Sequence, residues 1–276
     1  MIVKEFFDPT TFTLTYVVHK KGAAEAIVID PVLDYDPASG AIDEHSINLV
    51  VEYLRQENLS PAMSLETHAH ADHVSASQVL KKYFPEMKVA ISSRIVEVQK
   101  IFFKAFNLDE PSDGSQFDYL FADNEEVIIA GMKVLEIPTP GHTPACSAYL
   151  IEDAVFTGDA LFMPDYGVGR CDFPGGDARK LYHSITKNIY SLKSDTRIFV
   201  GHDYQPNGRP LKFVTTVGEE KESNIQLDAR VSEGEFVEKR EARDKTLSAP
   251  KLLLPSIQIN IMAGHLPEPE ANGVRI

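Results

Sequence analysis

The chain has few cysteines and no long apolar run, and each shortage excludes a class of protein. Its 276 residues include only two cysteines, Cys146 and Cys171. Two cysteines do not make a disulfide framework, so we expect a reducing, intracellular setting. No stretch approaches the roughly 18 apolar residues of a membrane span. The N-terminus, MIVKEFFDPTTFTLTY, also lacks the cationic start and apolar run of a signal peptide. We therefore expect a soluble, cytoplasmic protein with no membrane partner.

Basic residues are also in short supply. The chain has 27 Lys and Arg against 41 Asp and Glu, a formal net charge of -14. Such a field repels phosphate backbones, so we do not expect a nucleic-acid substrate. A small anionic ligand is still compatible, because it responds to nearby cations more than to the total charge. No nicotinamide- or flavin-binding motif is visible.

Repeats, low-complexity tracts and obvious linkers are missing too. We predict one domain over residues 1–276, with residues from about 228 to 276 as a C-terminal extension. Strands and helices mix in both halves, which predicts two packed sheets with helices outside. The predicted strands cover residues 13–19, 26–30, 62–68, 89–93, 126–140 (a hairpin), 147–162 (a pair) and 196–204. The predicted helices cover residues 44–59, 76–84, 94–106, 177–192 and 232–245, and residues 110–121 are predicted to form a loop.

What the chain does have is a dense group of metal-binding side chains. The stretch ETHAHADHV, residues 66–74, places His68, His70, Asp72 and His73 within one short turn, and it holds three of the nine histidines. Each residue has an ordinary alternative role, because Asp72 or His73 could cap the following helix.

Three later segments repeat the arrangement of a strand followed by a metal-binding side chain. KVLEIPTPGH ends in His142, AVFTGD ends in Asp159, and RIFVGHD ends in His202 and Asp203. Alone, His142 would be read as a hydrogen-bonded loop histidine and Asp159 as a turn residue or helix cap. Together, four strands with such residues at their ends favour one shared site, since open sheets commonly place sites at one edge.

The pattern H-x-H-x-D-H, G-H-T-P, T-G-D and G-H-D, in this order, resembles the metallo-β-lactamase superfamily. The resemblance runs from the N-terminal strands to about residue 227. It implies an α/β fold, the αββα sandwich of two mixed sheets with helices outside, and a metal site along one edge of the sheets. The superfamily contains hydrolases, nucleases and oxidoreductases, so the fold alone does not specify the reaction.

Finer motifs are most similar to the persulfide dioxygenases, also called sulfur dioxygenases. These are PTPGHTPACSAYL, FTGDALF, GVGRCDF, LYHSI and GHDY. The resemblance implies one Fe(2+) per chain, held by His68, His142 and Asp159, and oxidation of glutathione persulfide by O₂ to sulfite and glutathione. Two histidines and a carboxylate leave coordination positions open for O₂ and a substrate sulfur. Dimers are common among these enzymes, although the sequence does not specify an oligomeric state.

Two alternatives stay open. Glyoxalase II, a binuclear Zn(2+) thioester hydrolase, shares the ligands but usually carries H-E-Y where this chain has His202, Asp203 and Tyr204. Because His70, Asp72, His73 and His202 are all present, the ligands alone do not separate one iron from two zincs. In the dioxygenases these four residues persist around the ligands and orient them, as a remnant of a second metal site. A weaker alternative is a non-catalytic, metal-stabilised module that binds a basic partner.

Glutathione carries two carboxylates, so an acidic protein needs local cations to hold it. Arg170 in GVGRCDF is the first candidate, and Arg209 and Lys212 are the second. Asp203 and Tyr204 lie beside the expected ligands, Asp203 to orient them and Tyr204 to contact substrate.

The chain departs from the family at two places. The family's usual N-P-R reads Asn224-Ile225-Gln226 here and so loses an arginine, while the insertion PNGRPLK, residues 206–212, adds two cations. Cys146 and Cys171 are interpreted as small buried packing residues, since a catalytic thiol would need an adjacent base.

Overall fold

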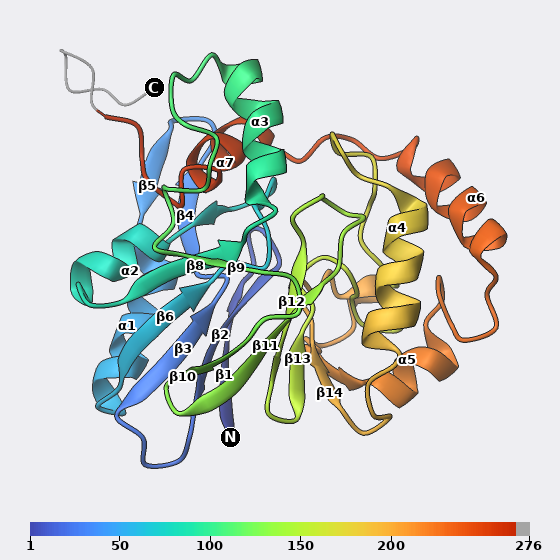
Figure 1. Cartoon of the computed structure of the whole chain (residues 1–276), viewed down its shortest axis with the longest axis horizontal. Coiled ribbons are helices and arrows are strands. Elements are labelled where there is room, and N and C mark those ends of the chain that lie inside the picture. Colours follow the sequence, from blue (N-terminus) through green and yellow to red (C-terminus); the bar gives the residue numbers. More distant parts are fainter. Residues whose placement is uncertain (269–276) are drawn as a thin grey trace.

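Two six-stranded sheets form the centre of the molecule (Figure 1). The structure is a computed structural model that describes residues 1–268. The first sheet has the strand order β1 (Ile2–Asp8), β2 (Thr13–His19), β3 (Glu25–Ile29), β6 (Ser60–Leu65), β8 (Lys88–Ser92) and β9 (Tyr119–Phe121). The second has the order β10 (Glu126–Ile129), β11 (Met132–Pro138), β12 (Ser147–Ile151), β13 (Ala154–Phe156), β14 (Arg197–Phe199) and β15 (Val214–Thr216). A small third sheet joins β5 (Ala41–Asp43), β4 (Val32–Asp36) and β7 (Val74–Ser75).

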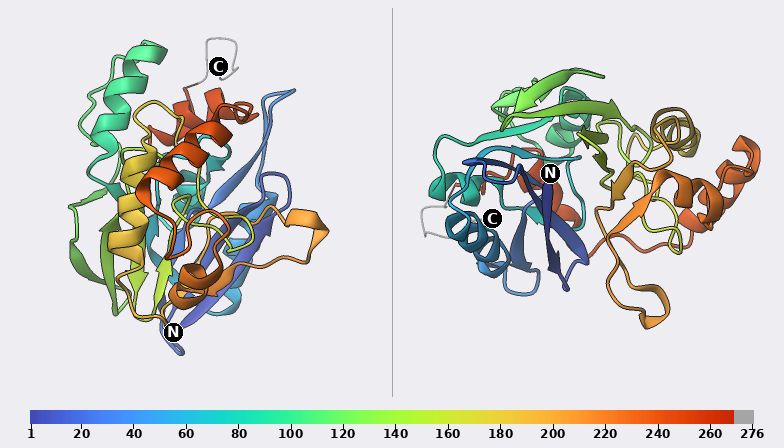
Figure 2. Two further views of the ribbon diagram at one scale, coloured as in Figure 1. Left: turned by 90° about the vertical axis from the view of Figure 1, so that its right-hand side faces the viewer. Right: turned by 90° about the horizontal axis from the view of Figure 1, so that it is seen from below.

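Both large sheets are mixed, as the resemblance implies. In the first, β3, β6, β8 and β9 run parallel, while β1 and β2 pair antiparallel. In the second, only the pair β13 and β14 is parallel. The helices are α1 (His45–Gln56), α2 (Ser77–Tyr83), α3 (Ile95–Phe106), α4 (Ala178–His183), α5 (Val217–Ser223), α6 (Glu233–Asp244) and α7 (Leu253–Asn260). They lie outside the two sheets, on both sides of the molecule (Figures 1 and 2).

Strand alternation explains why the sheets stack. In β2, Leu14, Tyr16 and Val18 are buried in the core between the sheets, while Val17 is buried under the helices on the opposite face. Successive side chains of a strand point to opposite faces, and β2 is buried at every position, so it is covered on both sides. The Tyr16 hydroxyl also donates to the Val200 carbonyl at 2.7 Å and ties the sheets together.

Most predicted elements are present, with two differences. The segment 110–121, predicted as a loop, ends in strand β9, because Phe121 is buried between the sheets. The helix predicted over 177–192 is α4 followed by a π-helical stretch, Ser184–Ile189. There the Thr186 hydroxyl donates to the Tyr182 carbonyl at 2.7 Å, and a side chain bonded to the backbone in this way can disturb the regular ladder. Ser232 and Glu235 form a capping box at the start of α6, the helix predicted over 232–245.

The last described residues pack onto the sandwich. Helix α6 lies against α4, and α7 contacts β7 and α3. In Figure 1 the chain passes over the top of the molecule between α6 and α7. Over residues 1–268, no helix has the length and apolar character needed to cross a membrane.

Candidate metal centre

Four turns that follow buried strands bring the predicted metal-binding side chains together. His68 lies just beyond β6, His142 beyond β11, Asp159 beyond β13 and His202 beyond β14. The ligand atoms of His68, His142 and Asp159 all lie within 4.8 Å of one another, and all three residues are buried. The strand ends therefore converge, as the pattern behind each residue predicts.

His68 is held so that one ring nitrogen is free. Its Nδ1 lies 3.1 Å from the Thr67 hydroxyl, which donates to the Asp30 carboxylate at 2.8 Å. Because that hydroxyl gives its proton to Asp30, it accepts a hydrogen bond from Nδ1–H and leaves the lone pair of His68 on Nε2. Nε2 is buried and has no hydrogen-bond partner among the described residues.

His142 is oriented in the same sense. Its Nδ1 donates to the Arg170 backbone carbonyl at 2.7 Å, so its lone pair is also on Nε2. That Nε2 lies 3.6 Å from Asp159 Oδ2. A backbone carbonyl thus fixes the ring, as is usual for histidines that bind metals.

Two glycines let these turns approach each other. Gly158 precedes Asp159, has a φ of +48°, and leaves no room for a Cβ against the Thr67 side chain. Gly169 lies so near the Asp159 carbonyl that a Cβ there would collide with the backbone. The motifs T-G-D and G-V-G-R therefore contain glycines that the site geometry requires.

One ring nitrogen of His70 faces two carboxylates. Its Nε2 lies 3.0 Å from Asp30 Oδ1 and 3.3 Å from Glu66 Oε2, while its Nδ1 is buried without a partner among the described residues. Glu66 Oε1 accepts from the hydroxyls of Ser75 and Ser77, each at 2.5 Å. Asp30 and Glu66, which the sequence analysis missed, thus fix the orientation of the His70 ring.

The remaining candidates lie beside this group. His73 is buried, and neither of its ring nitrogens has a hydrogen-bond partner among the described residues. His202 Nε2 lies 3.3 Å from Asp72 Oδ2 and 3.3 Å from Asp159 Oδ1. The structure therefore gathers every residue of the predicted two-metal set.

Burial and nearby charges shift the pKa values of these groups in different directions. Burial lowers the pKa of His68 and of His73 well below the ordinary value. Burial also acts to lower the pKa of His202, but Asp159 and Asp72 outweigh it and raise that pKa to about 9. Burial acts to raise the pKa of Asp159, yet the attraction of His202 and His142 holds it well below its usual range.

This donor set suits a metal ion. The unpartnered nitrogens of His68, His70 and His73 are buried, where a lone pair without a donor or a cation is costly. Two imidazoles and one carboxylate, as in His68, His142 and Asp159, are typical of non-haem Fe(II) sites, and imidazole also suits zinc.

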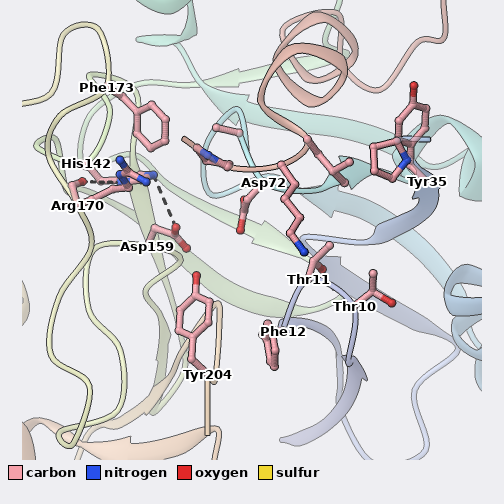
Figure 3. Close-up of a pocket in the computed structure, with 15 residues that line it drawn as sticks. Thr10, Thr11, Phe12, Tyr35, Asp72, His142, Asp159, Arg170, Phe173 and Tyr204 are labelled. Atoms are coloured by element: carbon pink, nitrogen blue, oxygen red, sulfur yellow. Dashed lines mark hydrogen bonds and ion pairs between the residues drawn. The ribbon is translucent and has the colours of Figure 1, made fainter. Parts of the chain in front are cut away.

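A cavity of about 460 Å³ opens onto these residues. Asp72, His142 and Asp159 form part of its wall, together with Phe173 and Tyr204. In Figure 3 the hydroxyl of Tyr204 points toward Asp159 and His142. Burial raises the pKa of Tyr204 well above its ordinary value, so this hydroxyl stays protonated and can donate a hydrogen bond.

Arg170, the first candidate for binding substrate, lies on the cavity wall, but its guanidinium is already engaged. Nε and Nη2 donate to the two carboxylate oxygens of Asp172, at 2.6 and 2.7 Å. Nη1 donates to the Ser248 carbonyl at 2.8 Å. Its charge is therefore largely balanced, and its side chain holds the segment that precedes α7.

Three predicted residues lie elsewhere. Neither Arg209 nor Lys212 is on the wall of this cavity as the structure describes it. Arg209 forms ion pairs with Asp165 and Asp203, and Lys212 donates its backbone N–H to Asp203 at 2.7 Å. The Asp203 carboxylate holds the loop around residues 205–212, and no hydrogen bond joins it to a metal-binding side chain among the described residues.

Both cysteines are buried free thiols, as expected. The Thr143 backbone N–H donates to Cys146 Sγ at 3.3 Å. Burial raises the pKa of Cys146 to about 12 and also raises that of Cys171, so neither is a thiolate at neutral pH.

The C-terminal part supplies two residues that sequence reasoning missed. Lys251 lies on the cavity wall beside Leu252. Asn260, at the end of α7, donates Nδ2 to the carbonyls of His70 and His73, each at 2.8 Å. No motif marks either position, and both follow the part of the chain that carries the resemblance.

Two proteins named ETHE1 are similar to this chain in sequence or in fold. Human mitochondrial persulfide dioxygenase ETHE1 is 29% identical, over 82% of this chain and 76% of the relative. The crystal structure of ETHE1 from Myxococcus xanthus superposes with a TM-score of 0.77 at 29% identity, covering 96% of this chain and 100% of that one.

Other relatives are more similar in sequence and carry different names. Glyoxylase B2 of Dictyostelium discoideum is 46% identical over 99% of this chain and 94% of its own length. A probable metallo-hydrolase of Burkholderia pseudomallei is 45% identical over 100% of this chain and 97% of the relative. The family model of the metallo-beta-lactamase superfamily matches residues 8–202. The chain therefore belongs to the metallo-β-lactamase superfamily.

Proposed function

We propose that the protein is an iron-dependent persulfide dioxygenase that acts on glutathione persulfide. The observation that carries the proposal is the group of His68, His142 and Asp159, whose ligand atoms lie within 4.8 Å of one another, with His142 and Asp159 on the cavity wall. Two histidines and one carboxylate leave open positions for a sulfur and O₂ at one ion. The likeness to persulfide dioxygenase ETHE1 of Homo sapiens supports the same reaction.

The reaction balances without another cofactor. Glutathione persulfide, O₂ and water give glutathione and sulfurous acid, which ionises to sulfite, and the four electrons lost by sulfur reduce O₂. Bound Fe(II) would supply the path for those electrons, which zinc lacks because it has no redox chemistry.

The side chains around the ion have distinct parts in this proposal. His68, His142 and Asp159 would hold the iron, and Thr67 and the Arg170 carbonyl fix the two imidazoles through Nδ1. Tyr204 donates a hydrogen bond toward the bound substrate from its stacked position on His202, with ring centroids 5.5 Å apart. His202 in turn lies within hydrogen-bonding distance of Asp159 and helps to orient it.

A second candidate is a binuclear zinc thioester hydrolase. His73 favours it, since both ring nitrogens are buried and without a partner among the described residues. His70, Asp72 and His73 also form a second close group of donors. The names glyoxylase B2 and probable metallo-hydrolase among the relatives point the same way.

Metal analysis and oxygen uptake distinguish the dioxygenase from the thioester hydrolase. Protein purified without added metal is expected to contain about one iron per chain. With glutathione persulfide it should consume O₂ and release sulfite in equal amounts. Two zinc ions per chain, no O₂ uptake and rapid cleavage of S-lactoylglutathione would establish the hydrolase instead.

Substitutions also distinguish the two candidate functions. His142→Ala should abolish both metal and turnover in either case, because it removes a ligand of the central group. His73→Ala distinguishes them, since a one-iron site keeps its metal content while a two-metal site loses one of two ions. The metal content of His73→Ala is therefore the direct measure of nuclearity.

A further inference from the structure

We propose that Lys251 binds a carboxylate of the substrate, and that the enzyme selects thiol persulfides carried on a short acidic peptide. This inference rests on the proposed function and adds the residue that recognises the peptide part. Lys251 lies in the segment between α6 and α7, outside the region 8–202 that matches the family.

The charges on the cavity wall single out this lysine. Arg170 has its guanidinium bonded to both oxygens of Asp172. Asp72 and Asp159 are acidic and face His202. Among the described residues that line the cavity, Lys251 is the cation for which no carboxylate partner is present. In a chain of net charge -14, it is the group on this wall best able to attract an anion.

The segment that carries Lys251 has its two ends on different sides of the cavity. The segment starts at Ser248, which Arg170 holds through its carbonyl. It ends at Leu252, which lines an adjoining hollow with Thr10 and Tyr35. In Figure 3, Thr10 and Tyr35 lie on the opposite side of the cavity from His142 and Arg170. The segment therefore crosses the cavity, with Lys251 near its far end.

This arrangement matches an elongated ligand with chemically different ends. A persulfide sulfur at His142 and Asp159 would leave the rest of the molecule running along the aromatic wall toward Lys251. The ammonium of a lysine is a flexible point charge, which suits a carboxylate on a mobile tail. Inorganic persulfide has no such tail and gains nothing from Lys251, whereas glutathione persulfide has two carboxylates.

Steady-state kinetics with charged and uncharged substrates test the proposal. Lys251→Ala should raise KM for glutathione persulfide about 3- to 10-fold at unchanged kcat, a modest effect because the lysine is exposed and its charge is screened. For the diethyl ester of glutathione persulfide, wild type and variant should have equal KM. Lys251→Gln should behave like Lys251→Ala, and Lys251→Arg should restore most of the affinity. Lys187→Ala removes an exposed lysine that is not on the cavity wall and serves as the control.

Binding of S-methylglutathione, measured by calorimetry, separates this inference from the proposed function. If the wild type consumes no O₂ but binds S-methylglutathione more tightly than Lys251→Ala does, the dioxygenase proposal fails and the role of Lys251 stands. Equal affinity of wild type and Lys251→Ala for S-methylglutathione, or an equal loss for the acid and the ester, would overturn the role of Lys251.

Discussion

Replacing Asn260 should weaken the metal centre from a position that touches no metal-binding side chain. The Asn260 amide donates to the carbonyls of His70 and His73, and its Oδ1 accepts from the Ser75 backbone N–H at 2.8 Å. His70 and His73 belong to the turn that carries the H-x-H-x-D-H motif, Ser75 lies in β7 directly after it, and Asn260 is only 4% exposed. One side chain thus pairs three backbone groups of the turn and of the strand that follows it.

The expected loss in the free energy of unfolding follows from those three hydrogen bonds. Asn260→Ala leaves two carbonyls and one N–H unpaired in the interior, and each unpaired group costs about 1 to 3 kcal/mol. Water can enter the space of the lost amide and satisfy part of this set, so we expect a loss of roughly 2 to 5 kcal/mol in the free energy of unfolding. That is a large share of the ~5 to 15 kcal/mol that stabilises a typical protein.

Two measurements check this expectation. Urea unfolding of the metal-free protein gives the loss in stability, and metal content after dialysis against a chelator gives the effect on the site. Metal affinity should fall roughly 10- to 100-fold, as for other groups that orient metal ligands. Asn260→Asp should be no better than alanine, because it sets a carboxylate oxygen against two carbonyl oxygens.

Asn48→Ala is the matched control, since Asn48 is exposed on α1. It should leave both unfolding and metal retention unchanged. If Asn260→Ala unfolds at the wild-type urea concentration and retains its metal, then α7 merely lies beside the turn and does not hold it.

Three further predictions follow from the site and its surroundings. Gly169→Ala should fold but lose metal, measured by elemental analysis, because the new methyl group displaces the Asp159 backbone; full metal content would contradict this. Arg170→Ala should raise KM for glutathione persulfide, because the segment at Ser248 loses its anchor, and unchanged kinetics would refute that link. Burial raises the pKa of Glu220 from 4.5 to about 8, so the folded state favours the protonated carboxyl. Stability should fall by up to about 1.4 kcal/mol per pH unit as pH rises from 4.5 toward 8. Glu220→Gln should remove that slope in urea unfolding, and an unaltered slope would exclude Glu220 as its source.

The sequence was sufficient to predict the central group of the site. His68, His142, Asp159 and His202 each follow an apolar strand, and open sheets commonly place sites at one edge. His68 follows a strand of the first sheet and the other three follow strands of the second, so the resemblance to the superfamily was also needed to assign them to one metal centre. The hairpin predicted over residues 126–140 is also present, and Ala130 and Gly131 at its turn have the positive φ that such a turn requires.

Arg209 was harder to place, because one of its two partners is distant in the sequence. It seemed available for substrate, but its charge is balanced by Asp203 and by Asp165, which precedes it by 44 positions. Nothing local to Arg209 indicates that pairing. Lys251 and Asn260 were missed for the opposite reason. No motif marks either residue, and each gains its role only through the packing of α7.

The contact between Asn260 and the ligand turn has a consequence for how the protein is made. The two partners His70 and Asn260 are 190 positions apart. A ribosome adding about 5 to 20 residues per second therefore completes the H-x-H-x-D-H turn roughly 10 to 40 seconds before Asn260 is synthesised. During that interval the turn lacks the Asn260 side chain that bonds to its carbonyls, so a metal ion that arrives early meets an unfinished site. Stable metal loading should accordingly follow the synthesis of α7, and chains interrupted before α7 should fail to retain the ion.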